Sequence, residues 1–147
     1  MFARRHVLSL ATALTLWVPF SATAMQWELA LDGTDPVAYF DDNAHLQGST
    51  TYAVMWRGQE WRFANADHRD AFEADPFTYL PAYDGQCAAC LAKGRNVAGD
   101  PAVWTIIDGR LYLNHSAPLA DLWEADYDAL RRAADAEWRE AGVADDR

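Results

Sequence analysis

Cys87 and Cys90 are the only two thiols in this chain of 147 residues, and they form a Cys-X-X-Cys motif. Such a pair can be a disulfide, a set of soft-metal ligands or a thiol–disulfide redox couple. As a structural staple it would be weak, because closing so short a loop contributes only about 2 kcal/mol in the chain-entropy model. The motif is the first candidate for chemistry, and the three interpretations stay open at this point.

Soft-metal binding is the interpretation that the residue types favour. Thiolates select copper or zinc, and a spacing of three residues on a helix places both sulfurs on one face. Zinc needs two further ligands for a closed tetrahedral site, whereas Cu(I) accepts fewer, so the pair alone could bind it. The side chains that could add a ligand are His45, His68, His115 and Met55. No organic cofactor is indicated.

Thiol–disulfide exchange is the alternative use of the same pair. Cys87 would lie near a helix N-terminus, where the helix dipole favours the thiolate, and Cys90 would resolve a mixed disulfide. However, the sequence shows no thioredoxin-like βαβ pattern, and its many acidic residues oppose thiolate formation. It also contains no nucleophile elbow, phosphate loop or HExxH motif. The sequence favours a protein that is not an enzyme, and no catalytic residue is predicted.

The N-terminus has the pattern of a leader. Arg4, Arg5 and His6 precede an apolar run over residues 7–20, and the small residues at 21–24 place a signal-peptidase cut before Met25. The run is short for a membrane span, so no anchor is expected after cleavage. The adjacent arginines also resemble the twin-arginine signal, and the export route stays open. We expect residues 1–24 to be a signal peptide and the protein to be periplasmic or secreted.

Charge excludes one class of partner. The chain has 12 basic and 22 acidic residues and a formal net charge of -10. Such a chain repels phosphate backbones, so nucleic acid is excluded as a principal partner. The expected partner is a metal ion or a redox partner protein.

The elements that would position the cysteines are short. Strand patterns at 50–56 and 59–63, and at 104–107 and 110–113, predict two β-hairpins, the second turned by Asp108-Gly109. Helices are expected at 65–74 and 86–93, and an amphipathic helix follows Ser116 to about residue 138. No internal repeat is apparent. Residues 25–147 are therefore predicted to form one small α+β domain with interleaved helices.

Several ordered motifs resemble a known family. Residues 35–40 read Asp-Pro-Val-Ala-Tyr-Phe, and the likeness continues at residues 57–58, 61–64, 72–76, 81–94, 99–101 and 111–114. This pattern is similar to exported YHS-domain proteins, which are related to metal-associated YHS domains. The resemblance covers residues 31–138 and implies a YHS-like domain over residues 25–147.

The resemblance also sets expectations for metal ligands. Metal-binding YHS segments carry cysteines at three positions that are held here by Ala38, Ala64 and His68. The metal site of those relatives is thus absent apart from one imidazole, while Cys90 is an addition in this chain. The predicted metal ligands are Cys87, Cys90 and His68.

Overall fold

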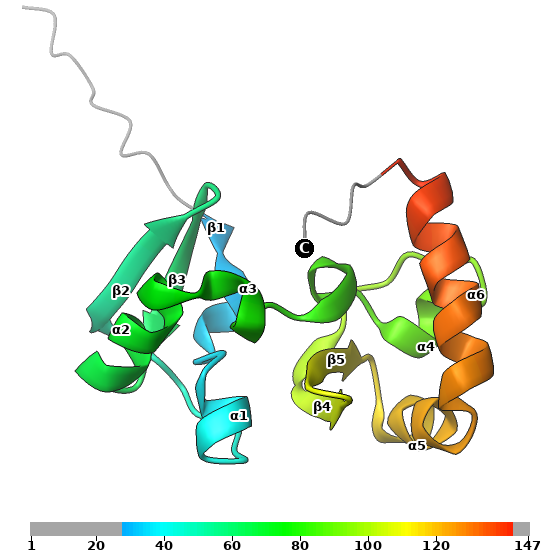
Figure 1. Cartoon of the computed structure of the whole chain (residues 1–147), viewed down its shortest axis with the longest axis horizontal. Helices are drawn as coiled ribbons and strands as arrows, with labels where there is room; N and C mark the ends of the chain where they lie inside the picture. Colours follow the sequence, from blue (N-terminus) through cyan, green and yellow to red (C-terminus); the bar gives the residue numbers. More distant parts are fainter. Residues whose placement is uncertain (1–27, 143–147) are drawn as a thin grey trace, which may run out of the picture.

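A computed structural model describes residues 28–142, so the predicted leader lies outside the described residues. Strands and helices alternate along the chain in an α+β arrangement, as predicted (Figure 1). The elements are β1 (Glu28–Leu29), η1 (Ala30–Gly33), α1 (Ala38–Asp41), β2 (Ser49–Trp56), β3 (Gln59–Phe63), α2 (Ala66–Ala74), α3 (Pro76–Tyr79), η2 (Ala82–Gly85), α4 (Ala88–Leu91), β4 (Asp100–Ile107), β5 (Arg110–Asn114), α5 (Ala117–Ala125) and α6 (Tyr127–Glu140), where η marks a 3-10 helix.

The strands form two small sheets, each in its own lobe. In the first lobe (residues 28–79), β3 pairs with β1 in parallel and with β2 antiparallel. In the second lobe (residues 82–142), β4 and β5 form an antiparallel hairpin. Figure 1 shows the two lobes side by side, with α1–α3 in the first and α4–α6 in the second. Residues 28–142 contain no helix with the length and apolarity of a membrane span.

The hairpins lie where the sequence predicted them, but two predicted helices differ. The helix expected at 86–93 is restricted to Ala88–Leu91, because Cys87 has an extended backbone (φ -62°, ψ 109°) and only caps it. The helix expected from Ser116 to residue 138 is divided in two. Asp126 leaves helical geometry (φ -133°, ψ 42°), which separates α5 from α6 and lets both pack on the second-lobe core.

The two lobes repeat one arrangement, which corrects the expectation that the chain has no internal repeat. Each runs from a 3-10 helix through a short helix and a hairpin to a longer helix. The 3-10 helices match in unusual detail, because three successive residues have positive φ in both. These are Leu31 (49°), Asp32 (51°) and Gly33 (81°) in the first lobe, and Tyr83 (55°), Asp84 (50°) and Gly85 (78°) in the second.

The hairpins repeat as well. Both contain a bulge after the first pair of the ladder, between Ser49 and Ala53 in β2 and between Asp100 and Trp104 in β4. The segment before each 3-10 helix also pairs in parallel with the second strand of its hairpin. In the first lobe Leu29 of β1 pairs with Glu60, and in the second lobe Pro81 forms an isolated bridge to Leu111. The two lobes are therefore two versions of one structural unit.

A glycine in each lobe makes the same close backbone contact. The Gly48 N–H donates to the carbonyl of Gly33 (2.8 Å), and the Gly99 N–H donates to that of Gly85 (2.9 Å). A Cβ on Gly48 would meet Arg62, and one on Gly99 would lie 2.5 Å from the Leu113 Cβ. Both positions therefore require glycine for space.

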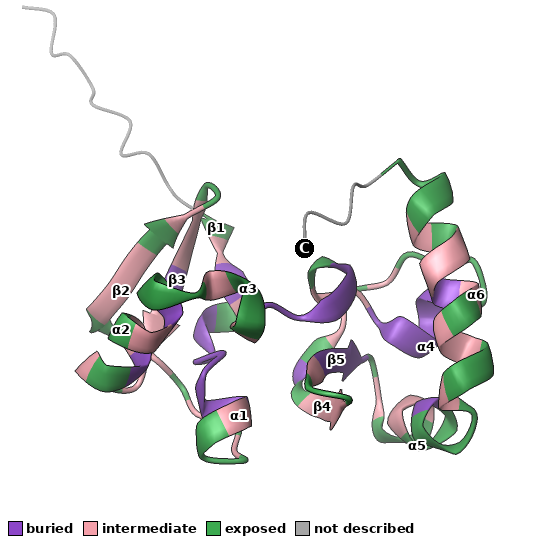
Figure 2. Ribbon diagram, in the orientation of Figure 1, coloured by how far each residue is buried: buried purple, intermediate pink, exposed green. Residues whose placement is uncertain are grey.

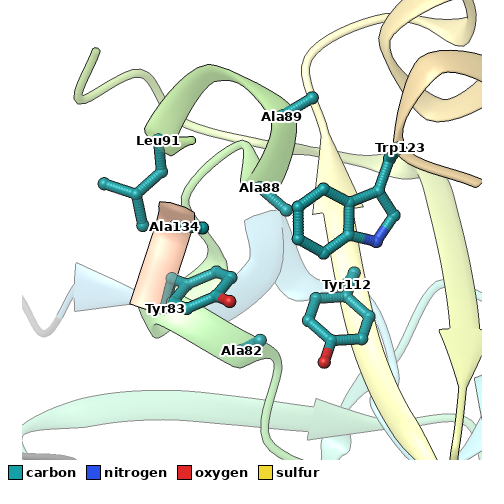
Figure 3. Packing of buried hydrophobic residues seen from close by; sticks show 8 residues of the cluster. All are labelled: Ala82, Tyr83, Ala88, Ala89, Leu91, Tyr112, Trp123 and Ala134. Carbon is teal, nitrogen blue, oxygen red and sulfur yellow. The ribbon is translucent and has the colours of Figure 1, made fainter. Parts of the chain in front are cut away.

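Three buried clusters hold the molecule together. The first-lobe cluster includes the buried aromatic residues Trp61, Phe63 and Phe72. The second-lobe cluster consists of Ala82, Tyr83, Ala88, Ala89, Leu91, Tyr112, Trp123 and Ala134 (Figure 3). A third cluster joins the lobes: Tyr39 from α1 packs with Leu111 and Leu113 from β5. The buried segments accordingly continue from one lobe into the other (Figure 2).

Candidate functional site

Cys87 and Cys90 form a disulfide at the start of α4. Their Cα atoms are 5.2 Å apart, as the Cys-X-X-Cys spacing allows. Cys87 is the residue that caps α4, and Cys90 lies in its only turn. The two residues are 0% and 2% exposed. Of the three interpretations of the motif, disulfide formation is the one confirmed, and the bond is enclosed by the second lobe.

The surroundings of the disulfide are mainly backbone groups. The Cys87 Sγ accepts the N–H of Cys90 (3.2 Å), and Asn114 Oδ1 accepts the N–H of Ala89 (3.1 Å). The Asn114 Oδ1 lies 4.0 Å from the Cys87 Sγ, while its Nδ2 is buried without a hydrogen-bond partner. Sulfur and amide oxygen together therefore satisfy two of the N–H groups in the first turn of α4, those of Ala89 and Cys90.

In the first lobe a carboxylate satisfies the corresponding groups. Asp35 is 0% exposed, and its Oδ1 accepts the N–H groups of Val37 (2.9 Å) and Ala38 (3.3 Å). Its Oδ2 accepts the N–H of Ala64 (2.8 Å) and lies 2.7 Å from the Nδ1 of His68. Asp35 thus fastens α1, the end of β3 and the start of α2 to one another.

Asp35 and Cys87 occupy equivalent places in the repeat. Each is the second residue after the glycine that ends its 3-10 helix, at Gly33 and Gly85. The Asp35 N–H donates to the carbonyl of Leu46 (2.9 Å), just as the Cys87 N–H donates to that of Val97 (2.8 Å). The disulfide therefore stands where the first lobe has a buried carboxylate.

His68, the third predicted metal ligand, is placed apart from the cysteines. It lies on α2, where its Nδ1 contacts Asp35 and its Nε2 is 3.6 Å from Asp42 Oδ2. The structure thus brings Cys87 and Cys90 together in the second lobe, whereas His68 lies in the first lobe. Over residues 28–142, no three or more His, Cys, Asp or Glu side chains are grouped to hold a metal ion.

The remaining candidate ligands are also dispersed. His45 contacts the hydroxyl of Thr34 (3.1 Å), and His115 lies 3.3 Å from the carbonyl of Ala98. Met55 is exposed on β2. Each belongs to local structure rather than to a site around the disulfide.

A cavity of about 380 Å³, which the sequence did not indicate, lies between the first lobe and the segment that leads into the second, where Leu80, Pro81 and Asp84 line it. Its volume lies within the range of small ligand sites. In its lining Ala30 and Trp61 are buried, Leu31 and Trp56 are half-buried, and Glu28, Arg57 and Asp84 are exposed, so charged groups of both signs line it. Because these residues come from β1, η1, η2 and both strands of the hairpin, no contiguous motif could have shown the cavity.

Comparisons of the chain with protein-family models, with curated proteins and with solved structures find no match.

Proposed function

We propose that this chain is an exported, non-catalytic binding module with a YHS-like, two-lobed fold, in which the Cys87–Cys90 disulfide has a structural role. The observation that carries the proposal is the equivalence of Cys87 with Asp35. Both side chains accept the N–H groups that open the next short helix. In the first lobe a carboxylate, which has no thiol chemistry, accepts these N–H groups. We therefore infer that the residue at the equivalent place in the second lobe also has a structural role, not a reactive one.

Burial supports the structural role. Reactive cysteines are partly exposed, because a partner thiolate has to approach a sulfur along the axis of the bond that it breaks. Both cysteines are almost fully enclosed, and Ala88 and Ala89 between them are buried as well. Thiol exchange would require α4 to move away from the elements packed around it, β5, α5 and α6.

Thiol–disulfide exchange is the second candidate, favoured by the N–H of Cys90 that points at the Cys87 Sγ. A partner dithiol would attack Cys87 and release Cys90 as a thiolate. The second thiol of the partner would then attack the mixed disulfide and release Cys87 as a thiolate that the Cys90 N–H stabilises, so the partner leaves as a disulfide and this chain keeps two thiols. Metal binding would use the same reduced state, since only thiolates bind Cu(I) or zinc.

The reduction potential of Cys87–Cys90 distinguishes these functions. We expect a value below about -300 mV, as in structural disulfides, with little reduction of the folded protein by glutathione. A Cys87→Ala, Cys90→Ala variant should keep its fold and lose about 2 kcal/mol of unfolding free energy. A potential near that of oxidising catalysts, about -120 to -180 mV, would instead establish the redox function.

Metal binding is tested on the reduced protein. Native mass spectrometry after addition of Cu(I) or zinc should show no stoichiometric complex that depends on the cysteines. A one-to-one complex that is lost in the Cys87→Ala, Cys90→Ala variant would overturn the structural role.

The intact mass of the exported protein should correspond to a chain that begins at Met25.

A further inference from the structure

The cavity beside the connecting segment has an apolar floor, which is the surface of the first-lobe core. Ala30, Trp61 and Leu80 line the cavity and are buried members of the first-lobe cluster. Leu31 lines it as well and packs against the same cluster. The indole N–H of Trp61 donates to the carbonyl of Trp56 (3.2 Å), so the hydrogen-bonding group of this ring is used within the hairpin. The floor therefore offers a ligand apolar contact.

Arg57 supplies a positive charge to the exposed lining of the cavity. It lies in the turn between β2 and β3, and its guanidinium carbon is 4.7 Å from the centroid of the Trp56 ring and 5.3 Å from that of the Phe77 ring. These two cation–π contacts position the guanidinium at the hairpin end of the cavity. A guanidinium suits a carboxylate ligand, because its planar fork can donate two parallel N–H groups.

Two carboxylates supply negative charge to the same lining. Glu28 lies in β1 and pairs with Gln59, next to the hairpin turn (Figure 1). Asp84 lies in η2, and both side chains are exposed at the cavity. Over residues 28–142, neither carboxylate has a side-chain hydrogen bond or an ion-pair partner. Their charge is therefore available to a ligand.

We infer that this cavity binds a small zwitterion with an apolar side chain, either a free amino acid or a short peptide. This inference rests on the proposed binding function and names the class of ligand. The ligand carboxylate lies at Arg57, its ammonium group lies at Glu28 and Asp84, and its side chain contacts the floor.

The signs of the charges select this class of ligand. An anion would face two carboxylates, a cation would face a guanidinium, and a neutral molecule would compensate none of the three charges. A zwitterion complements charges of both signs. The cavity volume of about 380 Å³ lies at the low end of ligand sites, which suits a molecule of this size.

Four ligands that share one apolar group test the inference. Phenylalanine, the dipeptide phenylalanyl-phenylalanine, phenethylamine and 3-phenylpropionate are titrated into the oxidised full chain by isothermal calorimetry at pH 7. We expect saturable one-to-one binding of a zwitterion, with shifts of the indole N–H signals of Trp56 and Trp61 in NMR spectra. Phenethylamine lacks the carboxylate and 3-phenylpropionate lacks the ammonium group, so each should bind roughly tenfold more weakly. Tighter binding of the dipeptide or of the free amino acid assigns the site to that source, and either result supports the inference.

Protein variants assign each charge to its end of the ligand. Arg57→Gln should weaken the binding of the zwitterion roughly tenfold and leave the affinity for phenethylamine undiminished. The double variant Glu28→Gln, Asp84→Asn should weaken the zwitterion to a similar extent and leave the affinity for 3-phenylpropionate undiminished. Asparagine is chosen at position 84 because it tolerates the left-handed backbone found there (φ 50°).

Matched controls remove the same kinds of charge elsewhere on the surface. Asp108→Asn changes the second hairpin turn, at the place that Arg57 has in the first, and Arg132→Gln changes an exposed residue of α6. Both should leave the affinities unchanged. Thermal unfolding of every variant shows that it is folded, and the carboxylate variants test the site independently of Arg57→Gln.

Three results would overturn the inference: no saturable binding of either zwitterion, binding of phenethylamine or 3-phenylpropionate as tight as that of the zwitterion, or an affinity that neither Arg57→Gln nor the double variant changes. These results leave the proposed structural role of the disulfide untouched, since the reduction potential tests that role in the second lobe.

Discussion

The buried carboxylate of Asp35 makes several of the hydrogen bonds that hold the first lobe together. Its oxygens accept N–H groups from α1 and from the residue after β3, and they contact the imidazole of His68. A buried donor that loses its acceptor costs about 1–3 kcal/mol. Much of the local stability therefore depends on a residue that the sequence resemblance marked only as part of a motif.

Replacing Asp35 should weaken the first lobe strongly. Asp35→Ala leaves the N–H groups of Val37, Ala38 and Ala64 without their acceptor, so we expect a loss of about 3 kcal/mol or more in urea unfolding. Asp35→Asn keeps one oxygen acceptor and should lose less. Asp121→Ala, on the exposed face of α5, is the control and should stay within about 0.5 kcal/mol of the parent. A similar small effect of Asp35→Ala would contradict the role described here.

The buried tyrosines of the second lobe predict a loss of stability in alkali. Burial, and then the hydrogen bond to Asp135, raises the pKa of Tyr83 above its ordinary value of 10.0. Burial raises the pKa of Tyr112 as well. The folded state thus favours the neutral phenols, and the contribution of these two tyrosines to the unfolding free energy should be constant below about pH 10 and fall as the pH rises further.

Urea unfolding at a series of pH values, with phenolate absorbance recorded at each, checks this expectation. Tyr83→Phe removes one titrating group and should make the decline above about pH 10 less steep. At pH 8 the same variant should lose about 1 kcal/mol, because the hydrogen bond to Asp135 is gone. An unchanged slope in Tyr83→Phe would show that this phenol does not contribute.

At the scale of elements, the turn residues made the hairpins predictable. Arg57-Gly58 and Asp108-Gly109 adopt the positive φ angles that two-residue hairpin turns need. The division of the last helix was not predictable, because the apolar spacing continues across Asp126 without interruption. The break brings the rings of Trp123 in α5 and Tyr127 in α6 together against Tyr112, a tertiary contact that the spacing does not contain.

Gly99 should tolerate no side chain. A Cβ there would lie 2.5 Å from the Leu113 Cβ and 2.7 Å from the Gly85 carbonyl oxygen, and neither neighbour is a flexible side-chain end. We expect Gly99→Ala to lose about 2–4 kcal/mol in thermal or urea unfolding. Gly109→Ala is the matched control: no atom lies within 4 Å of its Cβ, so only its positive φ opposes the change, at about 1 kcal/mol. Equal losses in the two variants would contradict the crowding at Gly99.

At the scale of the whole molecule, the interface cluster decides whether the lobes behave as one body. Tyr39 and Leu111 are both buried in it, and the Tyr39 hydroxyl donates to the carbonyl of Pro101 across the interface (2.7 Å). Since each lobe also has its own cluster, this shared contact couples two otherwise separate cores.

Removing a side chain from the interface should uncouple the lobes. Leu111→Ala leaves a cavity in the shared cluster, and we expect a loss of about 2–5 kcal/mol. Hydrogen exchange followed by mass spectrometry should show the amides of both lobes exchanging together in the parent and at different rates in the variant. The control is Leu122→Ala, which is exposed and should preserve the joint exchange.

The sequence predicted the α+β class, both hairpins and the cysteine pair, because each depends on local residue types. It did not predict the repeat, because equivalent positions differ in chemistry: Leu31 and Tyr83, Trp61 and Tyr112, Asp35 and Cys87. It could not separate His68 from the cysteines, since their distance depends on how two lobes pack. The cavity was invisible for the same reason.

Asp35 in the first lobe and the Cys87–Cys90 disulfide in the second lobe stand at equivalent positions but form under different conditions. A carboxylate accepts hydrogen bonds as soon as the chain folds, whereas a disulfide needs an oxidant. Under reducing conditions the hydrogen bonds of Asp35 can form, whereas the start of α4 lacks its covalent link. Oxidation therefore adds a covalent link to the second lobe alone.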